Sequence, residues 1–367
     1  MVKEIEMKKF FKPGANWLLI FIPISFALES AHASAPLIFF SAALSIIPIA
    51  KLIVHSTEQL ATYTGDAIGG LLNATFGNFP ELIIAVIALK AGLYTMVLAS
   101  IVGAILANLL LALGLSFFIG GTKYHIQEYN PTSARVYASM MFMAVISLAV
   151  PSSFNTLFGA HDVLRQESLL NIGLAIVLLI GYGLYLFFMI KTHPEFFKSN
   201  KDEEDENHED RWSKGRSILM LVIASVGAAF MSEVLVGAAE GTGEALGMSA
   251  TFIGIVFLAA VGGAAESFSA IAMAKKNKLD LSVGILLGSC IQITLFVAPV
   301  LVLLSLIVGP EPLHLSFPRS QIGALFFAVI IGSLISGDGR SNWFKGIQLI
   351  AIYIIIALMF FFIPDAV

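Results

Sequence analysis

The chain alternates long apolar segments with short polar connections, and eleven of the apolar segments are candidates for membrane-spanning helices. About 20 apolar residues cross a bilayer as a helix, so the pattern predicts an all-α integral membrane protein with about eleven transmembrane helices. The tenth segment is the shortest. The segments are Ala15–Ser30, Leu37–Thr64, Ile68–Leu89, Tyr94–Ile119, Ala134–Val150, Leu169–Ile190, Ile218–Leu246, Thr251–Ala274, Leu281–Leu306, Ile322–Ile335 and Ile347–Ile363.

Two short glycine motifs, each ending in a glutamate, interrupt this apolar pattern. Gly77–Glu81 lies in the third segment, and Gly262–Glu266 lies in the eighth, 185 positions later. The same spacing relates Lys90 to Lys275. Because the motifs are five segments apart, their helices cross the membrane in opposite directions. We therefore expect two inverted five-helix repeats plus an extra N-terminal helix, an architecture of secondary transporters.

This repeat divides the chain into four parts. We predict an N-terminal cytosolic segment with the first helix (1–35), a first repeat (36–191), an acidic cytosolic linker (192–216) and a second repeat (217–367). The acidic run Asp202–Asp210 is either a solvated connector or a cytosolic cation sensor.

Basic residues predict the orientation. Most of the 21 lysine and arginine residues fall in alternate connections, beginning with the basic segment Met1–Pro13. The positive-inside rule then places the N-terminus in the cytosol and the C-terminus outside. Since many spans follow and no clear cleavage site is present, the first helix is expected to be a retained anchor in a plasma membrane.

Composition excludes several classes of protein. The chain is 57% hydrophobic and 13% charged, whereas about a quarter of the residues of a soluble domain are charged. The net charge of −4 and the lack of a basic stripe argue against nucleic-acid binding. Cys290 is the only cysteine, so there is no intrachain disulfide framework. No HExxH motif or nucleophile–base pattern indicates an enzyme.

The two glutamates are expected near the membrane midplane. Glu81 precedes Lys90 by nine residues, and Glu266 precedes Lys275 by nine. At about 1.5 Å per helical residue this is about 14 Å, nearly half of a hydrocarbon core about 30 Å thick. A carboxylate at that depth costs about 2.5–3.5 kcal/mol, so it indicates an ion or proton site. The alternative is a polar contact between helices.

Paired carboxylates suit an exchange of cations for protons. Ca²⁺ takes about 6–8 oxygen ligands, and two carboxylates neutralise one such ion. Asn78 could add an amide oxygen, and backbone carbonyls near the glycines could add more. Without a cation the two carboxylates repel each other, and protonation relieves the repulsion. One divalent ion therefore competes with about two protons.

Four further polar residues are candidates with two interpretations each. Asn108 and Gln292 follow the two motifs by one segment, and they either line an ion path or tie helices together. Glu58 and Glu233 each precede a motif helix and follow a hydroxyl residue. They are either entry or exit sites for ions, or structural groups near the membrane surface.

The residues around both motifs resemble the calcium/proton exchanger (CAX) family of the cation/calcium antiporter superfamily. The similarity covers nearly the whole chain and is densest in Ile68–Gly121 and Gly262–Leu301. It implies an eleven-helix inverted-repeat bundle that works by alternating access. Glu81 and Glu266 would bind cation or protons in turn, and Asn78, Asn108 and Gln292 would be polar residues of the two signature repeats.

Two residues depart from that family's second motif, GNAAEH. Gly263 stands where the family has Asn, and Ser267 stands where it has His. The first change removes an amide ligand, and the second removes a group that titrates near neutral pH. We therefore expect the exchange reaction to follow the family, whereas ion preference and pH dependence can differ from it.

The leading prediction is a secondary antiporter that exports cytosolic Ca²⁺ in exchange for H⁺. Ca²⁺ is then the transported substrate, and no resident cofactor, nucleic acid or enzymatic reaction is expected; the sequence leaves a homo-oligomer open. Alternatives keep the fold but take another divalent cation such as Mn²⁺, or use Na⁺ as the counter-ion. A cation channel with both glutamates in a continuous pore is a different class.

Overall fold

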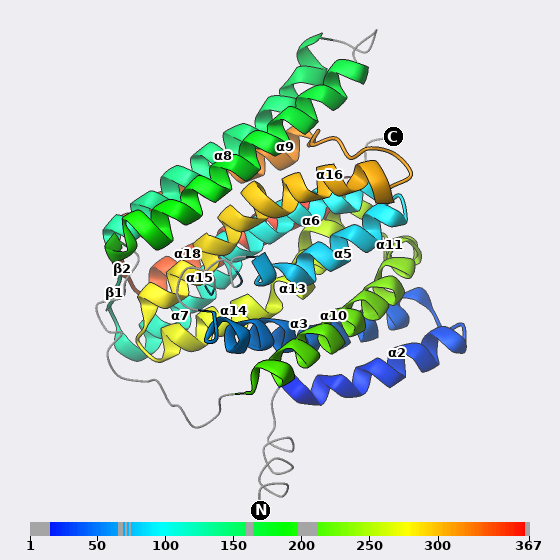
Figure 1. Ribbon diagram of the computed structural model, residues 1–367, viewed down its shortest axis with the longest axis horizontal. Coiled ribbons are helices and arrows are strands. Elements are labelled where there is room, and N and C mark those ends of the chain that lie inside the picture. Colours follow the sequence, from blue (N-terminus) through cyan, green and yellow to red (C-terminus); the bar gives the residue numbers. More distant parts are fainter. Residues whose placement is uncertain are drawn as a thin grey trace, which may run out of the picture.

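The computed structural model describes residues 15–64, 69, 72, 75–158, 164–196 and 212–363. The basic N-terminal segment 1–14 and the acidic run 202–210 lie outside the described residues, as does the start of the third predicted span. Figure 1 shows a bundle in which α8 and α9 lie along one side and α2, α3 and α10 along the other, with the remaining long helices between them.

The first half of the chain is helical apart from one short strand and the connections within the described residues. Its elements are η1 (Ala15–Ile20), α2 (Phe21–Ser30), α3 (Ala35–Ala61), α5 (Phe79–Lys90), α6 (Tyr94–Leu106), η2 (Ala107–Ala112), α7 (Leu113–Tyr124), β1 (Gln127–Glu128), α8 (Pro131–Phe158) and α9 (Leu164–Phe187). The short turns η3 (Phe188–Thr192) and η4 (Pro194–Phe196) follow α9.

The second half repeats the pattern of long and broken helices. Its elements are α10 (Lys214–Gly237), α11 (Ala239–Leu246), α12 (Ala250–Phe252), η6 (Ile253–Leu258), α13 (Ala259–Gly262), α14 (Ala264–Lys275), α15 (Leu279–Gln292), η7 (Ile293–Val297), α16 (Ala298–Val308), α17 (Arg319–Ser336), β2 (Arg340–Ser341) and α18 (Trp343–Phe362). The strands β1 and β2 form a two-residue antiparallel pair that the apolar pattern did not predict.

The apolar segments predicted from the sequence correspond to helices of this bundle. Among the described residues, eight helices are long and apolar enough to cross a membrane, and one further pair, Ala250–Gly262 and Ala264–Lys275, is bent by 59°. Asn16–Ser30 is a shorter apolar helix. The tenth segment is longer than expected, since α17 has 18 residues. The chain is a multi-pass membrane protein.

The two glutamate motifs start two matching half-helices. α5 and α14 each have 12 residues, begin directly after the glycine motifs and end at Lys90 and Lys275. Pro80 in the first turn of α5 suits a helix start, since its missing N–H is not needed there. The lysines lie in the last turns, where a positive charge interacts favourably with the helix dipole.

These half-helices run in opposite directions. Tyr94 begins the continuous 31-residue helix α6–η2–α7, about 46 Å long, four residues after Lys90 ends α5. At the far end of that helix, the Nζ of Lys123 and the hydroxyl of Tyr124 donate to the Lys275 carbonyl over 3.1 and 3.2 Å. The ends of α5 and α14 therefore lie at opposite ends of the bundle, as the spacing of the motifs predicted (Figure 1).

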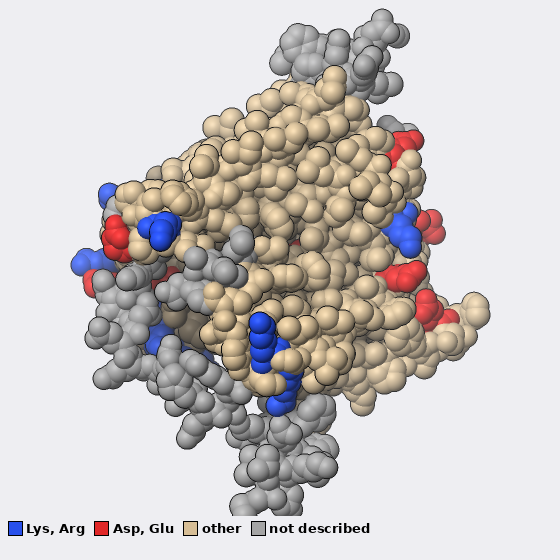
Figure 2. Space-filling model, viewed as in Figure 1, with Lys and Arg blue, Asp and Glu red and all other residues tan. Residues whose placement is uncertain are grey.

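The surface of the bundle suits a membrane. In Figure 2 the charged side chains of the described residues gather mostly toward two ends, with a broad uncharged belt between them. Large apolar side chains of the outer helices are exposed, among them Leu184 in α9, Phe327 in α17 and Ile355 in α18. In water such a surface would be costly, whereas lipid tails cover it.

Glycines allow the central helices to cross closely. A Cβ atom at Gly103 in α6 would overlap the backbone of Ile255 in η6. At Gly254 it would lie 2.6 Å from the Ala99 side chain and 2.8 Å from the Met96 carbonyl. Small residues at such crossings let backbones approach, which stabilises helix pairs in lipid.

Gly103→Ala is therefore expected to destabilise the protein by about 1–3 kcal/mol, because the added methyl meets backbone that cannot move aside easily. The measurement is the thermal unfolding midpoint of the detergent-solubilised protein. Gly173→Ala is the matched control, since a Cβ there meets nothing within 4 Å. Equal midpoints for the two variants would contradict the close crossing.

Candidate functional site

Glu81 lies in the first turn of α5, and its carboxylate reaches the break between α13 and α14. Both carboxylate oxygens are buried and have no hydrogen-bond partner among the described residues. A Cβ at Gly262 would lie 2.8 Å from the Cγ of Glu81. Only glycine at position 262 therefore leaves room for the Glu81 side chain.

Glu266 occupies the equivalent place in the first turn of α14. Its side chain is buried, and its Oε2 has no hydrogen-bond partner among the described residues. Ser289 and Asn108 interact with its carboxylate, and the charge of Glu81 acts on it. The structure thus brings the two glutamates into one buried polar cluster at the centre of the bundle.

A network of amides and one hydroxyl connects the two halves of the chain around these carboxylates. The Nδ2 of Asn108 donates to the Oγ of Ser289 over 3.0 Å, and this hydroxyl donates to the Oδ1 of Asn78 over 2.8 Å. The Nδ2 of Asn78 donates to the Oε1 of Gln292. Every member can offer oxygen to a cation, and none is positively charged.

Local helix geometry positions two of these amides. Asn108 lies in the π-helical turn η2, and Gln292 is the last residue before the π-helical turn η7. A π turn inserts an extra residue and so redirects the side chains around it, which is why such turns are frequent at functional sites. The two turns occupy nearly equivalent places in the two halves.

A cavity of about 410 Å³ leads from Glu266 toward the end of the bundle where α14 ends. Its inner part is bordered by Gly77, Glu266, Ser289 and Gln292. Its lining also includes polar residues at the starts of α8 and α15 and near the end of α3: Asn130, Ser133, Asp280 and Glu58. Water and ions therefore have a polar path to Glu266 from this end.

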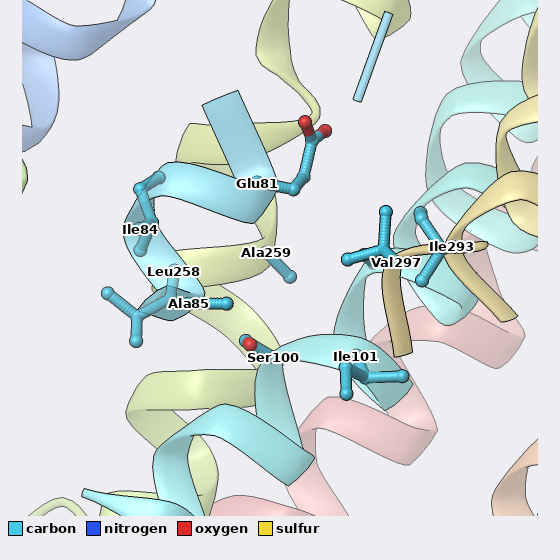
Figure 3. Close-up of a pocket in the computed structure, with 10 residues that line it drawn as sticks. Glu81, Ile84, Ala85, Ser100, Ile101, Leu258, Ala259, Ile293 and Val297 are labelled. Atoms are coloured by element: carbon cyan, nitrogen blue, oxygen red, sulfur yellow. The ribbon is translucent and has the colours of Figure 1, made fainter. Parts of the chain in front are cut away.

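The space on the other side of the cluster is small and apolar. A cavity of about 20 Å³ lies beside Glu81, with room for about one water molecule. Figure 3 shows mostly apolar side chains around it, including Ala85, Ile101, Ala259 and Val297, together with the hydroxyl of Ser100.

The 185-residue spacing shows that these two spaces are equivalent surfaces of the two halves. Ala104 lines the small cavity and Ser289 the large one, and 185 positions separate them. The same relation holds for Ile84 and Ser269. A third pair runs the other way, since Ser100 lines the small cavity and Ile285 the large one. One path to the glutamates is thus wide and contains many polar groups, and its counterpart is narrow and mostly apolar.

The structure places the candidate residues from the sequence in different environments. Glu81, Glu266, Asn78, Asn108 and Gln292 lie together in the central cluster. Glu58 is exposed and lines the large cavity, with its carboxylate 3.8 Å from the Nδ1 of His55. Glu233 is exposed on α10 and does not line either of these two cavities.

Sequence reasoning missed Ser289 and Asp280. Ser289 is the hub of the network, and Asp280 lines the cavity while accepting a hydrogen bond of 2.6 Å from the Asn130 backbone N–H. Ser289 precedes Gln292 by three residues, so both lie on one face of α15. That spacing was a signal for Ser289, whereas the position of Asp280 depends on the loop after β1.

Known proteins resemble this chain along almost its full length. A family model described as sodium/calcium exchanger protein matches residues 34–191 and 216–362. The Ca(2+)/H(+) antiporter of Aphanothece halophytica is 41% identical over 362 residues, which cover 95% of this chain and 96% of that protein. The Ca(2+)/H(+) antiporter ChaA of Bacillus subtilis is 41% identical over 342 residues, covering 93% and 96%. The solved structure of native YfkE superposes with a TM-score of 0.81 at 38% identity, covering 94% of this chain and 100% of that one.

Ser289→Ala tests the network. The substitution removes the acceptor for Asn108 and the donor for Asn78, and each buried group left unpaired costs about 1–3 kcal/mol. We expect a lower thermal midpoint of the purified protein. Ser225→Ala is the control, because the Ser225 hydroxyl bonds only within its own helix, to the Leu221 carbonyl. A midpoint equal to that of Ser225→Ala would show that the network does not stabilise the fold.

Proposed function

This chain belongs to the sodium/calcium exchanger protein family, and we propose that it is a secondary antiporter that exports cytosolic Ca²⁺ in exchange for H⁺. The single observation that carries this proposal is the pair of buried carboxylates, Glu81 and Glu266, in one polar cluster. The printed names of the bacterial relatives, Ca(2+)/H(+) antiporters at 41% identity, support the choice of ions.

The chemistry of the cluster explains the exchange. Two facing carboxylates without a positive partner are stable only when something neutralises them. One Ca²⁺ does this, with Asn78, Asn108, Gln292 and Ser289 supplying neutral oxygens around it. About two protons do it equally well. Because the same two carboxylates bind either Ca²⁺ or protons, release of one accompanies binding of the other.

Alternating access explains how Ca²⁺ and protons cross the membrane. The large cavity reaches Glu266 from the end of the bundle that carries Lys275, the end that basic residues assign to the cytosol. The equivalent path beside Glu81 is closed by apolar side chains. This arrangement corresponds to a state that faces the cytosol, and the inverted halves (36–191 and 217–367) would exchange roles to face outward.

The two cavities favour an exchanger over a channel. A channel needs a continuous path with the glutamates lining both sides, whereas here one side has about 410 Å³ and the other about 20 Å³. The alternatives of Mn²⁺ as substrate or Na⁺ as counter-ion use the same oxygens. Ca²⁺ flux driven by a proton gradient or by Na⁺ alone distinguishes the two counter-ions, and the same flux measured with Mn²⁺ tests the other substrate. The bacterial relatives support a plasma-membrane location.

The central test measures Ca²⁺ uptake into inside-out membrane vesicles under an imposed proton gradient. Uptake should depend on that gradient and collapse with a protonophore. Glu81→Gln and Glu266→Gln should each lower the initial rate on the order of 100-fold, since each removes a charged ligand. Glu244→Gln, an exposed residue of α11, is the control. Uptake driven by Na⁺ alone would overturn the proton assignment, and full activity in either site variant would remove that carboxylate from the mechanism.

Glu58 is expected to attract cations to the large cavity without coordinating them at its centre. An exposed carboxylate contributes about 0.2–1 kcal/mol to a charge interaction, so Glu58→Gln should raise the cytosolic KM for Ca²⁺ about two- to fivefold. The maximal rate should stay unchanged. The effect should shrink at high ionic strength, which screens exposed charges. A loss of maximal rate at unchanged KM would instead place Glu58 in the transport step.

A further inference from the structure

A groove of about 420 Å³ lies between η1, α3 and α14, apart from the two cavities beside the glutamates. Its walls are mostly apolar, with Leu18 from η1, Ile47 from α3, and Ala265, Phe268 and Ala272 from α14. Phe268 is 57% exposed, and Ala272 is exposed as well. The groove is therefore open to the surroundings of the bundle, which in a membrane are lipid.

One charged residue, Lys51 of α3, also lines this groove. It lies ten residues before Ala61, the last residue of α3, which is about 15 Å along the helix. Its side chain is exposed, and its ammonium group has no hydrogen bond or ion pair with any described residue. A lysine at such a depth is costly in lipid unless its long side chain extends toward the membrane surface and finds a partner.

Aromatic and basic side chains mark that surface one turn further along α3. His55 follows Lys51 by four residues, so both lie on one face of the helix. The centroids of the His55 and Trp212 rings are 4.8 Å apart, and the Arg216 guanidinium lies 4.7 Å from the Trp212 ring centroid. Tryptophan and arginine side chains of membrane proteins gather at the level of the lipid headgroups. This level is about 6 Å from Lys51 along the helix, within reach of the lysine side chain.

We propose that this groove binds one anionic phospholipid, from the leaflet at the end of the bundle where α14 ends. Lys51 binds the lipid phosphate, and an acyl chain lies against Leu18, Phe268 and Ala272. Charge complementarity identifies the occupant, because an apolar groove with one unpaired cation fits an amphiphile with a negative headgroup. In a zwitterionic lipid, the ammonium group of the headgroup competes with Lys51 for the phosphate.

The lipid site adjoins the path to the glutamates without being part of it. Ser269 borders both this groove and the large cavity, and Ala265 directly precedes Glu266 in the chain. The helix that carries Glu266 therefore forms the wall between the lipid and the carboxylates. Lipid binding here does not depend on which ions the protein exchanges, so it is tested separately from transport.

The test measures the thermal midpoint of the purified full-length protein in detergent during titration with phosphatidylglycerol. A lipid that binds the folded protein raises the midpoint, and we expect a rise of about 3 °C at saturation. Phosphatidylcholine with the same acyl chains should raise it by less than about 1 °C. Glycerol phosphate, which has the phosphate without the acyl chains, should have no effect. An equal rise with phosphatidylcholine or with glycerol phosphate would overturn the inference.

Three variants locate the effect. Lys51→Gln removes the charge and keeps most of the side-chain length, so it should raise the phosphatidylglycerol concentration at half-effect about fivefold, the usual contribution of one lysine. Ala272→Phe keeps Lys51 but fills the groove, and it should weaken the response at least as much. Lys276→Gln is the control, because it removes an exposed lysine at the end of α14 that does not line the groove.

A wild-type response in Lys51→Gln would place the lipid elsewhere and overturn the inference. Equal losses in Lys51→Gln and Lys276→Gln would also overturn it, because they would indicate a general attraction of anionic lipid to basic residues. An unchanged response in a folded Ala272→Phe protein would exclude the groove as the site of the acyl chain.

Discussion

The structure depends on one electrostatic constraint: two carboxylates face each other in a buried cluster with no positive side chain to pair with either. Among the described residues, no lysine or arginine forms an ion pair with Glu81 or Glu266. Unpaired charge at this depth is costly, and protein interiors normally supply a partner. In the proposed function, the partner comes from solution, as a cation or as protons. Both glutamates lie in the first turn of a half-helix, where the helix dipole stabilises negative charge.

That constraint accounts for the unusual local structure around the cluster. The two half-helices start at Phe79 and Ala264, directly after the glycine motifs, and Gly262 gives the Glu81 side chain room beside the second start. The surrounding network uses amides and a hydroxyl, which offer oxygens to a cation without replacing it by a fixed charge. A fixed ammonium group in the same place would neutralise a carboxylate permanently and leave no need for a mobile ion. In the proposed function, the neutral network therefore keeps the carboxylates available to a transported ion.

Local sequence signals predicted much of this architecture, because hydropathy and helix-breaking residues act within short windows. The apolar runs predicted the helices, and the 185-residue spacing predicted that α5 and α14 run in opposite directions. Features that depend on packing between distant segments were not predictable in this way. The pairing of β1 with β2, the place of Asp280 beside the loop after β1, and the exposed position of Glu233 all belong to this class. Ser289 lies between the two cases, since its spacing from Gln292 was visible but its role as a hub needed Asn78 and Asn108 in place.

The two halves share a backbone plan but differ in the side chains that line their paths, and Ser100 of the closed cavity corresponds to Ile285 of the open one. Ser269 and Ser289 border the open cavity, whereas Ile84 and Ala104 border the closed one. Opening the second path would bring water against an apolar lining, and closing the first would bury hydroxyl groups. Both changes cost free energy. In the proposed cycle a bound ion or proton pair neutralises the carboxylates, and that neutralisation offsets the cost of the change. The same pair of glutamates would then bind the transported ions and also control the change between the two conformations.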